Sequence, residues 1–500
     1  MEINETVMKF KAHLAKMAAY SHASSILYYD VETVMPDLGK NEYGKTIAFL
    51  SEQRYKLSTS EDLKTYVEEI LAHKDEVDFV TIREAEELQE NFEKMSKIPM
   101  EDYVAYTTAV NNSQIAWHEA KEKSDYSIFE PHLAELLDYT VKFAKMTNPK
   151  LSTYNAQLDN YEKGLNTELL DAFFADIRQT IKPLMQKIAD HGKCIDDSFL
   201  KLEYPIDKQR ELSQYLMDVL GLDKQRSTIG ETEHPFTIGI SADDVRITTH
   251  YYKDYVASNI YSVVHEGGHA LYELNIGREL ENSPLRSGTS MSIHESQSRF
   301  YENIIGRSEE FISYIYPKLL ELFPTQLNGV SAHDFYLAVN KSEPSLIRTE
   351  ADELTYSLHI MVRYELEKRL LSGELSTKDL PAEWNRLYKE YIGIDVPNDK
   401  VGVLQDSHWS SGSFGYFPSY ALGSAYGVQM LESMKKNFNP FEQISKGNIM
   451  KINEWLTDKV FKYGCLLKPN EIIKTSCNAE FDSKYYTDYL TKKFTEIYEL

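Results

Sequence analysis

The amino-acid sequence predicts a mainly α-helical fold with a small β-ribbon. Five segments carry apolar residues at spacings of three and four, with lysine and glutamate between them, as amphipathic helices do. These segments are 5–30, 80–97, 128–146, 167–190 and 207–220. The sequence shows neither an internal repeat nor a linker rich in proline or serine. We therefore expect the whole chain, 1–500, to form one large domain.

Two short alternating runs predict the β-ribbon. Residues 236–240 and 245–249 alternate β-branched or aromatic side chains with small or polar ones, and a polar turn separates them. They end shortly before the helical run 261–272. An exposed edge of such a ribbon could hold a peptide in extended form through backbone pairing. A ribbon that only covers helix ends is the alternative.

Composition excludes several classes of partner. The 78 acidic residues outnumber the 54 basic ones and give a formal net charge of −24, which repels phosphate backbones and anionic lipid surfaces. We therefore expect neither nucleic acid nor membrane as a partner. No run of 18 apolar residues occurs, and the N-terminus lacks the basic and apolar regions of a secretion signal. These features favour a soluble, cytoplasmic protein.

Common cofactor and nucleophile motifs are absent from the sequence. It contains no Walker phosphate loop, no glycine-rich dinucleotide fingerprint and no Gly-x-Ser-x-Gly nucleophile motif. The three cysteines, Cys194, Cys465 and Cys477, are isolated, which argues against both a disulfide framework and a cysteine metal site. The common nucleotide and serine-hydrolase chemistries therefore have no visible site in this sequence.

The most informative motif is His265-Glu266-Gly267-Gly268-His269. In an α-helix, residues four apart lie on one face about 6 Å apart along the axis, so both imidazoles can bind one tetrahedral ion. Glu266 then lies beside the ion and can act as a general base toward the attacking water. The pattern indicates a zinc site that hydrolyses peptide bonds.

Gly267 and Gly268 are unusual inside a helix. Each glycine disfavours a helix interior by about 0.8 to 1.0 kcal/mol relative to alanine. One interpretation is that the substrate backbone or an opposing strand approaches closely at this point. The other is tight packing between helices.

A catalytic zinc site needs a third protein ligand and keeps one open position. The best candidate is Glu295, in a second helical stretch at 292–302 that follows a loop through 282–284. His294 and Glu302 are the fallback candidates, each more simply explained as a residue that supports the ligands. We expect one zinc ion per chain, although such a nitrogen and oxygen site also suits cobalt.

Six short motifs occur in order between residues 234 and 409. They are His234-Pro235-Phe236, Asp244-Val245-Arg246-Ile247-Thr248, His265 to His269, His294-Glu295-Ser296-Gln297, Ile347-Arg348-Thr349-Glu350-Ala351-Asp352, and Gly402-Val403-Leu404-Gln405-Asp406-Ser407-His408-Trp409. Together they resemble the Taq-type zinc metallocarboxypeptidases, and the total length is also similar to that family. One departure is Tyr28-Tyr29-Asp30, where the family pattern has a tryptophan just before the aspartate.

The resemblance implies an architecture for the chain. Members of this family have helices arranged in two lobes that flank a long, deep groove, with zinc at its floor, and they usually form homodimers. We therefore expect a homodimeric peptidase whose catalytic motifs lie within residues 234–420 and whose partners are peptide substrates.

The resemblance also suggests which residues stabilise the negative charge that hydrolysis builds on the carbonyl oxygen. The motif carries His408 directly, and in related peptidases a histidine and a tyrosine after the zinc helices donate to this oxygen. We expect His408 and Tyr420 to fill these roles, with Tyr416 as the alternative to Tyr420.

A carboxypeptidase must bind the terminal carboxylate of its substrate, and the planar fork of arginine suits both oxygens. Arg348 is the leading candidate because it lies in a family motif, Arg246 is the second, and His234 could line the same pocket. Four nearby polar residues are expected to orient these arginines or the ligand histidines rather than to react. They are Asp244, Asp352, Gln405 and Asp406.

The sequence therefore predicts a zinc-dependent carboxypeptidase that releases single C-terminal residues with broad side-chain tolerance. An oligopeptidase or a dipeptidyl carboxypeptidase could use the same zinc residues. A catalytically silent, zinc-stabilised binding protein is a third possibility, but it would not need the base Glu266.

Overall fold

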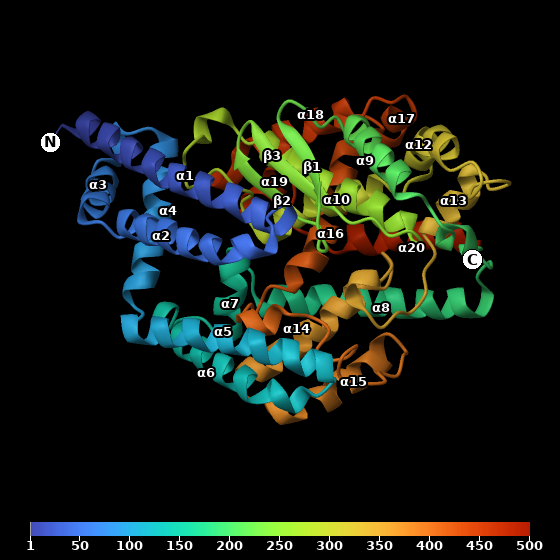
Figure 1. Ribbon diagram of the computed structural model, residues 1–500, viewed down its shortest axis with the longest axis horizontal. Helices are drawn as coiled ribbons and strands as arrows, with labels where there is room; N and C mark the ends of the chain where they lie inside the picture. The colour runs from blue at the N-terminus through green and yellow to red at the C-terminus, as the bar shows by residue number, and fades with distance from the viewer. Residues whose placement is uncertain (1) are drawn as a thin grey trace.

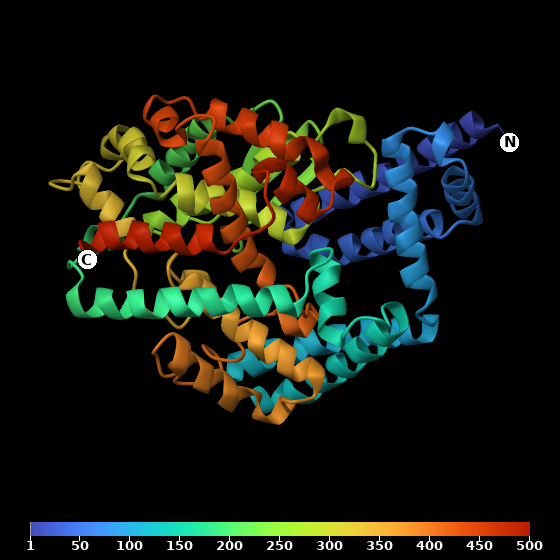
Figure 2. The ribbon, with the colours of Figure 1, turned by 180° about the vertical axis from the view of Figure 1, so that it is seen from behind.

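The structure is a computed structural model that describes residues 2–500 (Figures 1 and 2). It is mainly helical with one small sheet, as predicted. In the described residues the α-helices are α1 (Ile3–Thr33), α2 (Lys40–Ser58), α3 (Glu61–Ala72), α4 (Phe79–Ser96), α5 (Met100–Lys123), α6 (Glu130–Thr147), α7 (Thr153–Tyr161), α8 (Thr167–His191), α9 (Ile206–Leu220), α10 (Val256–Leu274), α11 (Met291–Arg299), α12 (Glu309–Leu322), α13 (Ala332–Val339), α14 (Tyr356–Ser372), α15 (Leu380–Tyr391), α16 (Pro418–Lys435), α17 (Pro440–Ser445), α18 (Met450–Lys459), α19 (Pro469–Cys477) and α20 (Lys484–Tyr498). The strands are β1 (Ser227–Glu231), β2 (Thr237–Ser241) and β3 (Asp244–Thr249).

The five predicted helical segments correspond to α1, α4, α6, α8 and α9. Local signals set several of their ends. The side chain of Asp78 accepts a hydrogen bond from the backbone of Thr81 at the start of α4, and Asn166 caps α8 in the same way. Gly221 ends α9 in the left-handed conformation, with φ of 79°, which costs glycine least among residues.

The predicted ribbon forms, and a third strand extends it. β2 and β3 pair antiparallel, and β1 pairs parallel with β3, so the strand order is β1-β3-β2. β1 was not predicted, because this strand is short and includes serine, glycine and glutamate, which carry little strand signal. β2 is therefore an edge strand, and it lies beside the helix that carries the His-Glu-Gly-Gly-His motif.

One large hydrophobic core holds most of the described chain together, from α5 to α20. A second, smaller cluster joins α1, α3 and α4 near the N-terminus. In Figure 1 these N-terminal helices extend to one side of the main body, and α5, α6, α14 and α15 lie below the sheet and its helices. Within the described residues, no helix is long and apolar enough to cross a membrane.

α10 lies in the main core between the sheet and two other helices. Helix α9 packs against one side of it, and α11 against another. α11 in turn packs most closely against α16, where Gly423 lets the two backbones approach: an added Cβ there would lie 2.8 Å from the Cβ of Glu295. This packing fixes where the side chains of α10, α11 and α16 meet.

Candidate metal centre and active site

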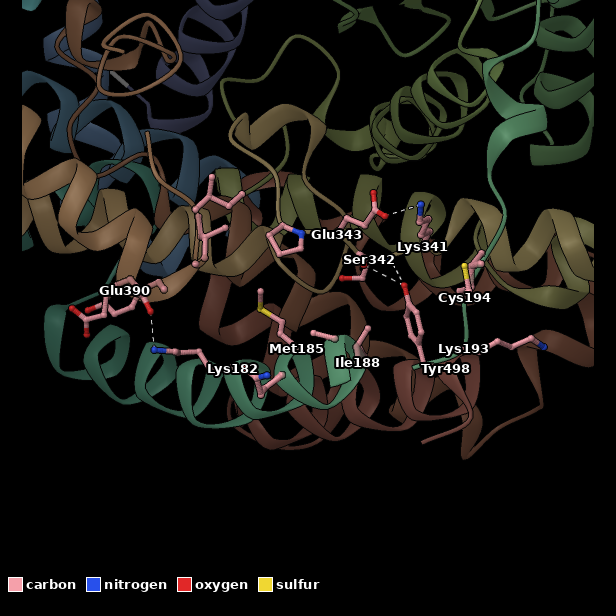
Figure 3. A pocket seen from close by; sticks show the side chains of 18 residues that line it. Lys182, Met185, Ile188, Lys193, Cys194, Lys341, Ser342, Glu343, Glu390 and Tyr498 are labelled. Carbon is pink, nitrogen blue, oxygen red and sulfur yellow. Dashed lines mark hydrogen bonds and ion pairs between the residues drawn. The ribbon is translucent and has the colours of Figure 1, made fainter. Parts of the chain in front are cut away.

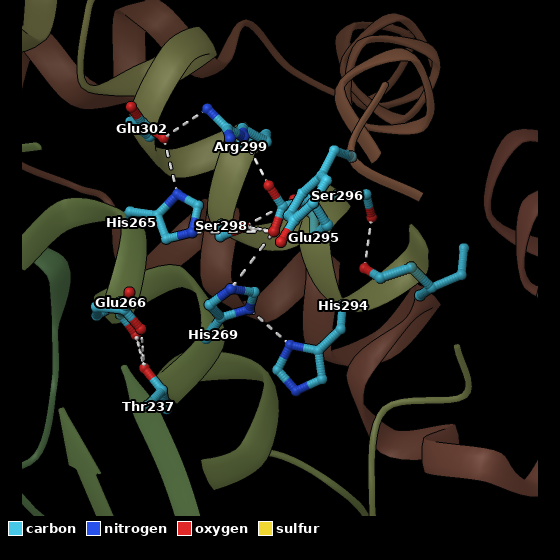
Figure 4. Close-up of polar contacts among 12 residues, drawn as sticks. Thr237, His265, Glu266, His269, His294, Glu295, Ser296, Ser298, Arg299 and Glu302 are labelled. Atoms are coloured by element: carbon cyan, nitrogen blue, oxygen red, sulfur yellow. Dashed lines mark hydrogen bonds and ion pairs between the residues drawn. The ribbon is translucent and has the colours of Figure 1, made fainter. Parts of the chain in front are cut away.

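Helix α10 carries the two histidines of the motif. Apolar residues surround this helix on most sides, so it is buried along most of its length. His265 and His269 lie one turn apart and point toward the same space, with ring centroids 5.0 Å apart (Figure 4). The spacing predicted from the sequence therefore brings the two imidazoles together.

The glycines between them are explained by packing. An added Cβ at Gly267 would lie 2.5 Å from Leu220 of α9, and one at Gly268 would lie 2.7 Å from the backbone oxygen of Gln297 in α11. A side chain at either position would push a neighbouring helix away. Of the two interpretations, the structure supports tight helix packing.

Glu295 completes a group of three possible metal ligands. Ser290 caps the N-terminus of α11 by accepting from the backbone of Ile293, which sets the start of the helix. Oε2 of Glu295 lies 3.9 Å from Nε2 of His265 and 3.7 Å from Nε2 of His269. The three ligand atoms lie within 4.8 Å of one another. Two imidazoles and one carboxylate match the donor set of catalytic zinc sites.

The Nδ1 atoms of both ligand histidines have hydrogen-bond partners. Glu302 contacts His265 directly, whereas Glu273 acts on His269 through His294. Nδ1 of His265 lies 2.8 Å from the Glu302 carboxylate, which accepts a hydrogen bond from it. Nε2 of His294 lies 2.9 Å from Oε1 of Glu273, and Nδ1 of His294 lies 2.6 Å from Nδ1 of His269. If His294 donates to Glu273, its Nδ1 accepts from His269, and the Nε2 lone pairs of both ligand histidines face the site.

The fallback candidates His294 and Glu302 do not point a ligand atom at the space between the histidines, as Glu295 does. Each contacts a ligand histidine and lies outside the group of three possible metal ligands. Glu302 belongs to the π-helical turn η6 (Phe300–Ile305) that continues α11. Such turns are frequent at functional sites because they re-aim a side chain.

Burial and neighbouring charges adjust the protonation of the site. Burial and the nearby His294 lower the pKa of His269 well below its usual value, which favours the neutral form that binds metals. Burial opposes the charged form of His265, but the hydrogen bond to Glu302 and the negative charges of Glu295, Glu302 and Glu266 together raise the pKa of this histidine. Burial also raises the pKa of Glu266. Burial acts in the same direction on Glu302, but Arg299, His265 and Arg307 together lower the pKa of that carboxyl to about 2.

The carboxylate of Glu266 contacts the sheet. The hydroxyl of Thr237, on the edge strand β2, donates to Oε2 of Glu266 at 2.7 Å (Figure 4). The residue as a whole is buried, with 7% of its surface exposed. Glu266 is therefore a buried carboxylate on the ligand helix that lies outside the group of three possible metal ligands.

His408 and Tyr420 contact each other. His408 lies in the short helix η9 (His408–Ser411), and Tyr420 lies in the first turn of α16. Nε2 of His408 is 3.2 Å from the Tyr420 hydroxyl, while no residue in 2–500 bonds its buried Nδ1. Burial lowers the pKa of His408 to about 4, so its ring is neutral near pH 7. The alternative residue, Tyr416, stacks edge-on against Tyr420.

Arg348 is buried and held by polar neighbours. It begins the short helix η7 (Arg348–Glu350), and its Nε and Nη2 donate to Oδ1 of Asp406 at 3.0 and 2.8 Å. Its Nη1 donates to the Tyr356 hydroxyl at 3.0 Å, and its guanidinium lies 4.9 Å from the ring centre of Tyr420. Asp406 thus orients an arginine, as predicted, and it also binds the buried Arg363.

The second arginine, Arg246, is also held by an aspartate. Its Nε and Nη2 donate to Asp244 at 2.8 and 2.7 Å, and its guanidinium lies 5.0 Å from the ring centre of Tyr29 in α1. Tyr29 belongs to the segment that departs from the family pattern, so α1 meets the second motif through this tyrosine. His234 lies exposed between β1 and β2.

The other two polar residues hold backbone segments. Asp352 accepts from Ser342, Thr355 and backbone N–H groups, which fixes the loop that leads to Arg348. Gln405 accepts from the backbone of Arg348 at 3.0 Å and from Nη2 of Arg363 at 2.8 Å.

Several supporting residues were not predicted from the sequence. They are Thr237, Glu273, Arg299, Tyr356 and Arg363. Arg299 could have been found, because it lies four residues after Glu295 on the same helix, a spacing that places two side chains on one face. Glu273 follows His269 at the same spacing of four on α10, but it contacts that histidine through His294. Thr237 contacts Glu266 from strand β2, 29 residues earlier, so no local pattern marks it.

A cavity of about 580 Å³ lies away from these residues (Figure 3). Helix α8, the loop around Ser342 and the C-terminal Tyr498 line it. Its walls contain none of the predicted catalytic or ligand residues. The chemistry described above therefore does not take place in this cavity.

Comparison with known proteins gives consistent matches. Residues 9–494 match the family model of the carboxypeptidase Taq (M32) metallopeptidases. The chain is 38% identical to carboxypeptidase 1 of Bacillus subtilis (strain 168), with 100% of both chains covered. It is 32% identical to thermostable carboxypeptidase 1 of Thermus thermophilus, with 99% of this chain and 98% of that protein covered.

Solved structures agree with these matches. The M32 carboxypeptidase of Deinococcus radiodurans R1 superposes with a TM-score of 0.96 at 28% identity, over 99% of this chain and 100% of that one. A carboxypeptidase of Pyrococcus furiosus superposes with a TM-score of 0.94 at 33% identity, over 98% and 99% of the two chains. With its ligand group and the full-length matches, the chain belongs to the carboxypeptidase Taq (M32) family and is a metallocarboxypeptidase.

Proposed function

We propose that this protein is a zinc carboxypeptidase that releases single residues from the C-termini of peptides with broad side-chain tolerance. The observation that carries the proposal is the meeting of His265, His269 and Glu295, with Glu266 held beside them as a fourth group that does not join the ligands. A structural zinc site would use four protein ligands and would need no base.

Zinc suits the three donors, and when bound it would polarise a carbonyl and lower the pKa of a water molecule. The residues of the chain then have separate tasks. Glu266 takes the proton from the attacking water, and its raised pKa brings it closer to the working pH range of a general base. Thr237 holds this carboxylate toward the substrate's path through its hydrogen bond.

His408 and Tyr420 are proposed to stabilise the oxygen of the scissile carbonyl as negative charge develops. The ring of His408 is neutral, and its buried Nδ1 has no partner in the described chain, so a substrate oxygen could satisfy an N–H there. Tyr420 offers its hydroxyl next to this ring. Donors of this kind are commonly worth about 3 to 4 kcal/mol.

Arg348 is proposed to bind the terminal carboxylate. A guanidinium has five N–H donors, and Asp406 and Tyr356 engage three of them, which leaves two for a ligand. Burial strengthens such a pair, because the surrounding dielectric is low. Arg246 is the second candidate, although Asp244 engages both nitrogens of its fork. His234 could line the same region.

The edge strand β2 is proposed to bind the substrate backbone. Its free edge could pair with an extended peptide, and Thr237 on the same strand contacts the base. We also propose a cytoplasmic homodimer, with peptides as the only partners, because the family resemblance implies this assembly. Multi-angle light scattering of the purified protein tests the dimer.

Mass spectrometry of a mixed set of peptides tests the proposed activity. Each peptide is incubated with zinc-loaded protein, and the products are followed over time. Loss of one C-terminal residue after another is expected, with Glu266→Gln protein as the inactive control. Dipeptide release or internal cleavage would instead support the sibling activities, and no reaction would contradict the proposal.

A further inference from the structure

Three contacts connect the metal ligand Glu295 to Arg348. Nε of Arg299 donates to Oε1 of Glu295 at 2.7 Å. The guanidinium of Arg299 lies over the face of the Tyr356 ring, 4.3 Å from its centre. The Tyr356 hydroxyl accepts from Nη1 of Arg348 at 3.0 Å. The four side chains therefore form one continuous path between the metal centre and the proposed carboxylate receptor.

We infer that Arg299 and Tyr356 are positioning residues that set the metal ligand Glu295 and the receptor Arg348 at a fixed spacing. This inference rests on the proposed function, because it takes Arg348 as the group that binds the terminal carboxylate. An exopeptidase cleaves the bond that reaches its metal when the terminal carboxylate is bound. The spacing between the two sites therefore decides how many residues leave.

Arg299 controls the orientation of Glu295. Because Arg299 engages Oε1, the other oxygen of the carboxylate, Oε2, is the one that faces the two histidines at 3.7 and 3.9 Å. Nη1 of Arg299 also lies 3.3 Å from Oε2 of Glu302, the carboxylate that orients His265. One planar guanidinium thus holds two carboxylates of the site at once (Figure 4). Lysine has no such fork.

Tyr356 connects this arginine to the receptor through two different parts of its side chain. The ring face attracts the guanidinium of Arg299, and the hydroxyl at the far end accepts from Arg348. The residue is only 5% exposed and begins α14, so its ring is fixed by packing. The rigid phenol therefore acts as a spacer between the two arginines.

The two parts of Tyr356 allow the two contacts to be removed separately. Tyr356→Phe removes the hydroxyl but keeps the ring below Arg299, whereas Tyr356→Leu removes both. Arg299→Lys keeps the positive charge but loses the fork. Arg178→Lys is the matched control, because Arg178 also lies over a tyrosine ring, Tyr391, at 5.8 Å, on the distant helix α8.

Two quantities are measured for each variant. Zinc affinity is determined by competition with a chromophoric chelator, without any turnover, and circular dichroism checks the fold. KM is then measured at saturating zinc for a peptide with a free C-terminus and for its amidated form.

Arg299→Lys should weaken zinc binding by about 10- to 100-fold with helix content unchanged, because substitutions of residues that orient metal ligands have effects of this size. Tyr356→Phe should keep the zinc affinity within twofold and raise KM for the free acid by about fivefold, the value of one ordinary hydrogen bond. Tyr356→Leu should weaken zinc binding and also raise KM for the free acid. Arg178→Lys should change neither the zinc affinity nor KM.

Wild-type zinc affinity in folded Arg299→Lys would overturn the inference. If Arg299→Lys does not fold, the zinc affinity of Tyr356→Leu is the test. A wild-type zinc affinity in that variant would also overturn the inference. The failure of the proposed function has a different signature. In that case Tyr356→Phe would change KM equally for free and amidated peptides, or not at all. Zinc binding would still be weakened in Arg299→Lys and Tyr356→Leu and nearly unchanged in Tyr356→Phe.

Discussion

The Thr237 hydroxyl donates to the carboxylate of Glu266 at 2.7 Å, so the edge strand β2 holds this carboxylate. The same hydroxyl also lies 3.0 Å from the backbone oxygen of Glu266. A substrate paired along β2 would therefore lie next to Glu266, the residue proposed to activate the water. The contact joins the small sheet to helix α10 in an otherwise helical fold.

Removing this hydroxyl should reduce turnover without releasing the metal. Thr237→Val keeps the shape of the side chain but leaves the buried carboxylate without its donor, and an unpaired buried group of this kind costs about 1 to 3 kcal/mol. We expect kcat to fall by about 5- to 100-fold, with zinc content unchanged. Thr237→Ser, which keeps the hydroxyl, should restore most of the activity. Equal loss in both variants would show that the methyl group matters and the hydrogen bond does not.

Arg348→Ala should reduce kcat/KM mainly for substrates with a free carboxylate. A charge-assisted contact is worth about 1.5 to 3 kcal/mol, so a loss of roughly 10- to 150-fold is expected for the free acid. On amidated peptides, which the wild type should cleave poorly, the variant should lose little more. Arg246→Ala is the matched comparison. Equal impairment on both kinds of peptide would give Arg348 a structural role, together with its partner Asp406.

Chelation should abolish activity but leave the fold. The main hydrophobic core runs from α5 to α20 and does not depend on one ion, so circular dichroism should show nearly unchanged helix content after metal removal. Stoichiometric zinc, or cobalt, should restore turnover. Loss of most helical signal on chelation would mean that the ion has a structural role that this core does not explain.

The buried Glu367 should make stability depend on pH. Burial raises its pKa from 4.5 to about 7, although Trp409, Gly415 and Tyr154 all donate to its carboxylate. The folded state therefore binds this proton more tightly than the unfolded state, and the stabilisation is complete below pH 4.5 and lost as pH rises through 7.

Glu367→Gln should remove about 3 kcal/mol of this dependence between pH 4.5 and 8, measured by chemical denaturation. Some dependence should remain, because burial likewise raises the pKa of Glu162 to about 7. Glu374→Gln, at an exposed position, is the control and should keep the wild-type slope. A wild-type slope in the Glu367 variant would mean that this carboxylate does not titrate in that range.

Local patterns explain which parts could be predicted from the sequence. The helical periodicity of 167–190 and the alternation of 245–249 depend only on neighbouring residues, and both elements form as predicted. The spacing of His265 and His269 likewise fixes their common face. β1 was missed because its pairing with β3 joins segments separated by β2, and its own side chains carry little strand signal.

The contacts that orient the site could not be predicted in the same way. Gly268 is required by the backbone of α11, and Gly423 by Glu295, and neither neighbour is local in sequence. The link from Arg299 to Tyr356 crosses from α11 to α14. Such contacts arise when helices pack, so a motif marks the ligands but does not show what holds them.

The most direct test of the account is to measure zinc content and turnover together in Glu266→Gln and Glu295→Gln. Elemental analysis and peptide hydrolysis are performed on the same preparations. We expect the Glu266 variant to keep stoichiometric zinc and to lose turnover by about 100-fold or more, because the ligands remain but the proton acceptor does not. The Glu295 variant should bind zinc more weakly. A Glu266 variant that loses its zinc, beside a Glu295 variant that keeps it, would contradict the assignment of ligand and base.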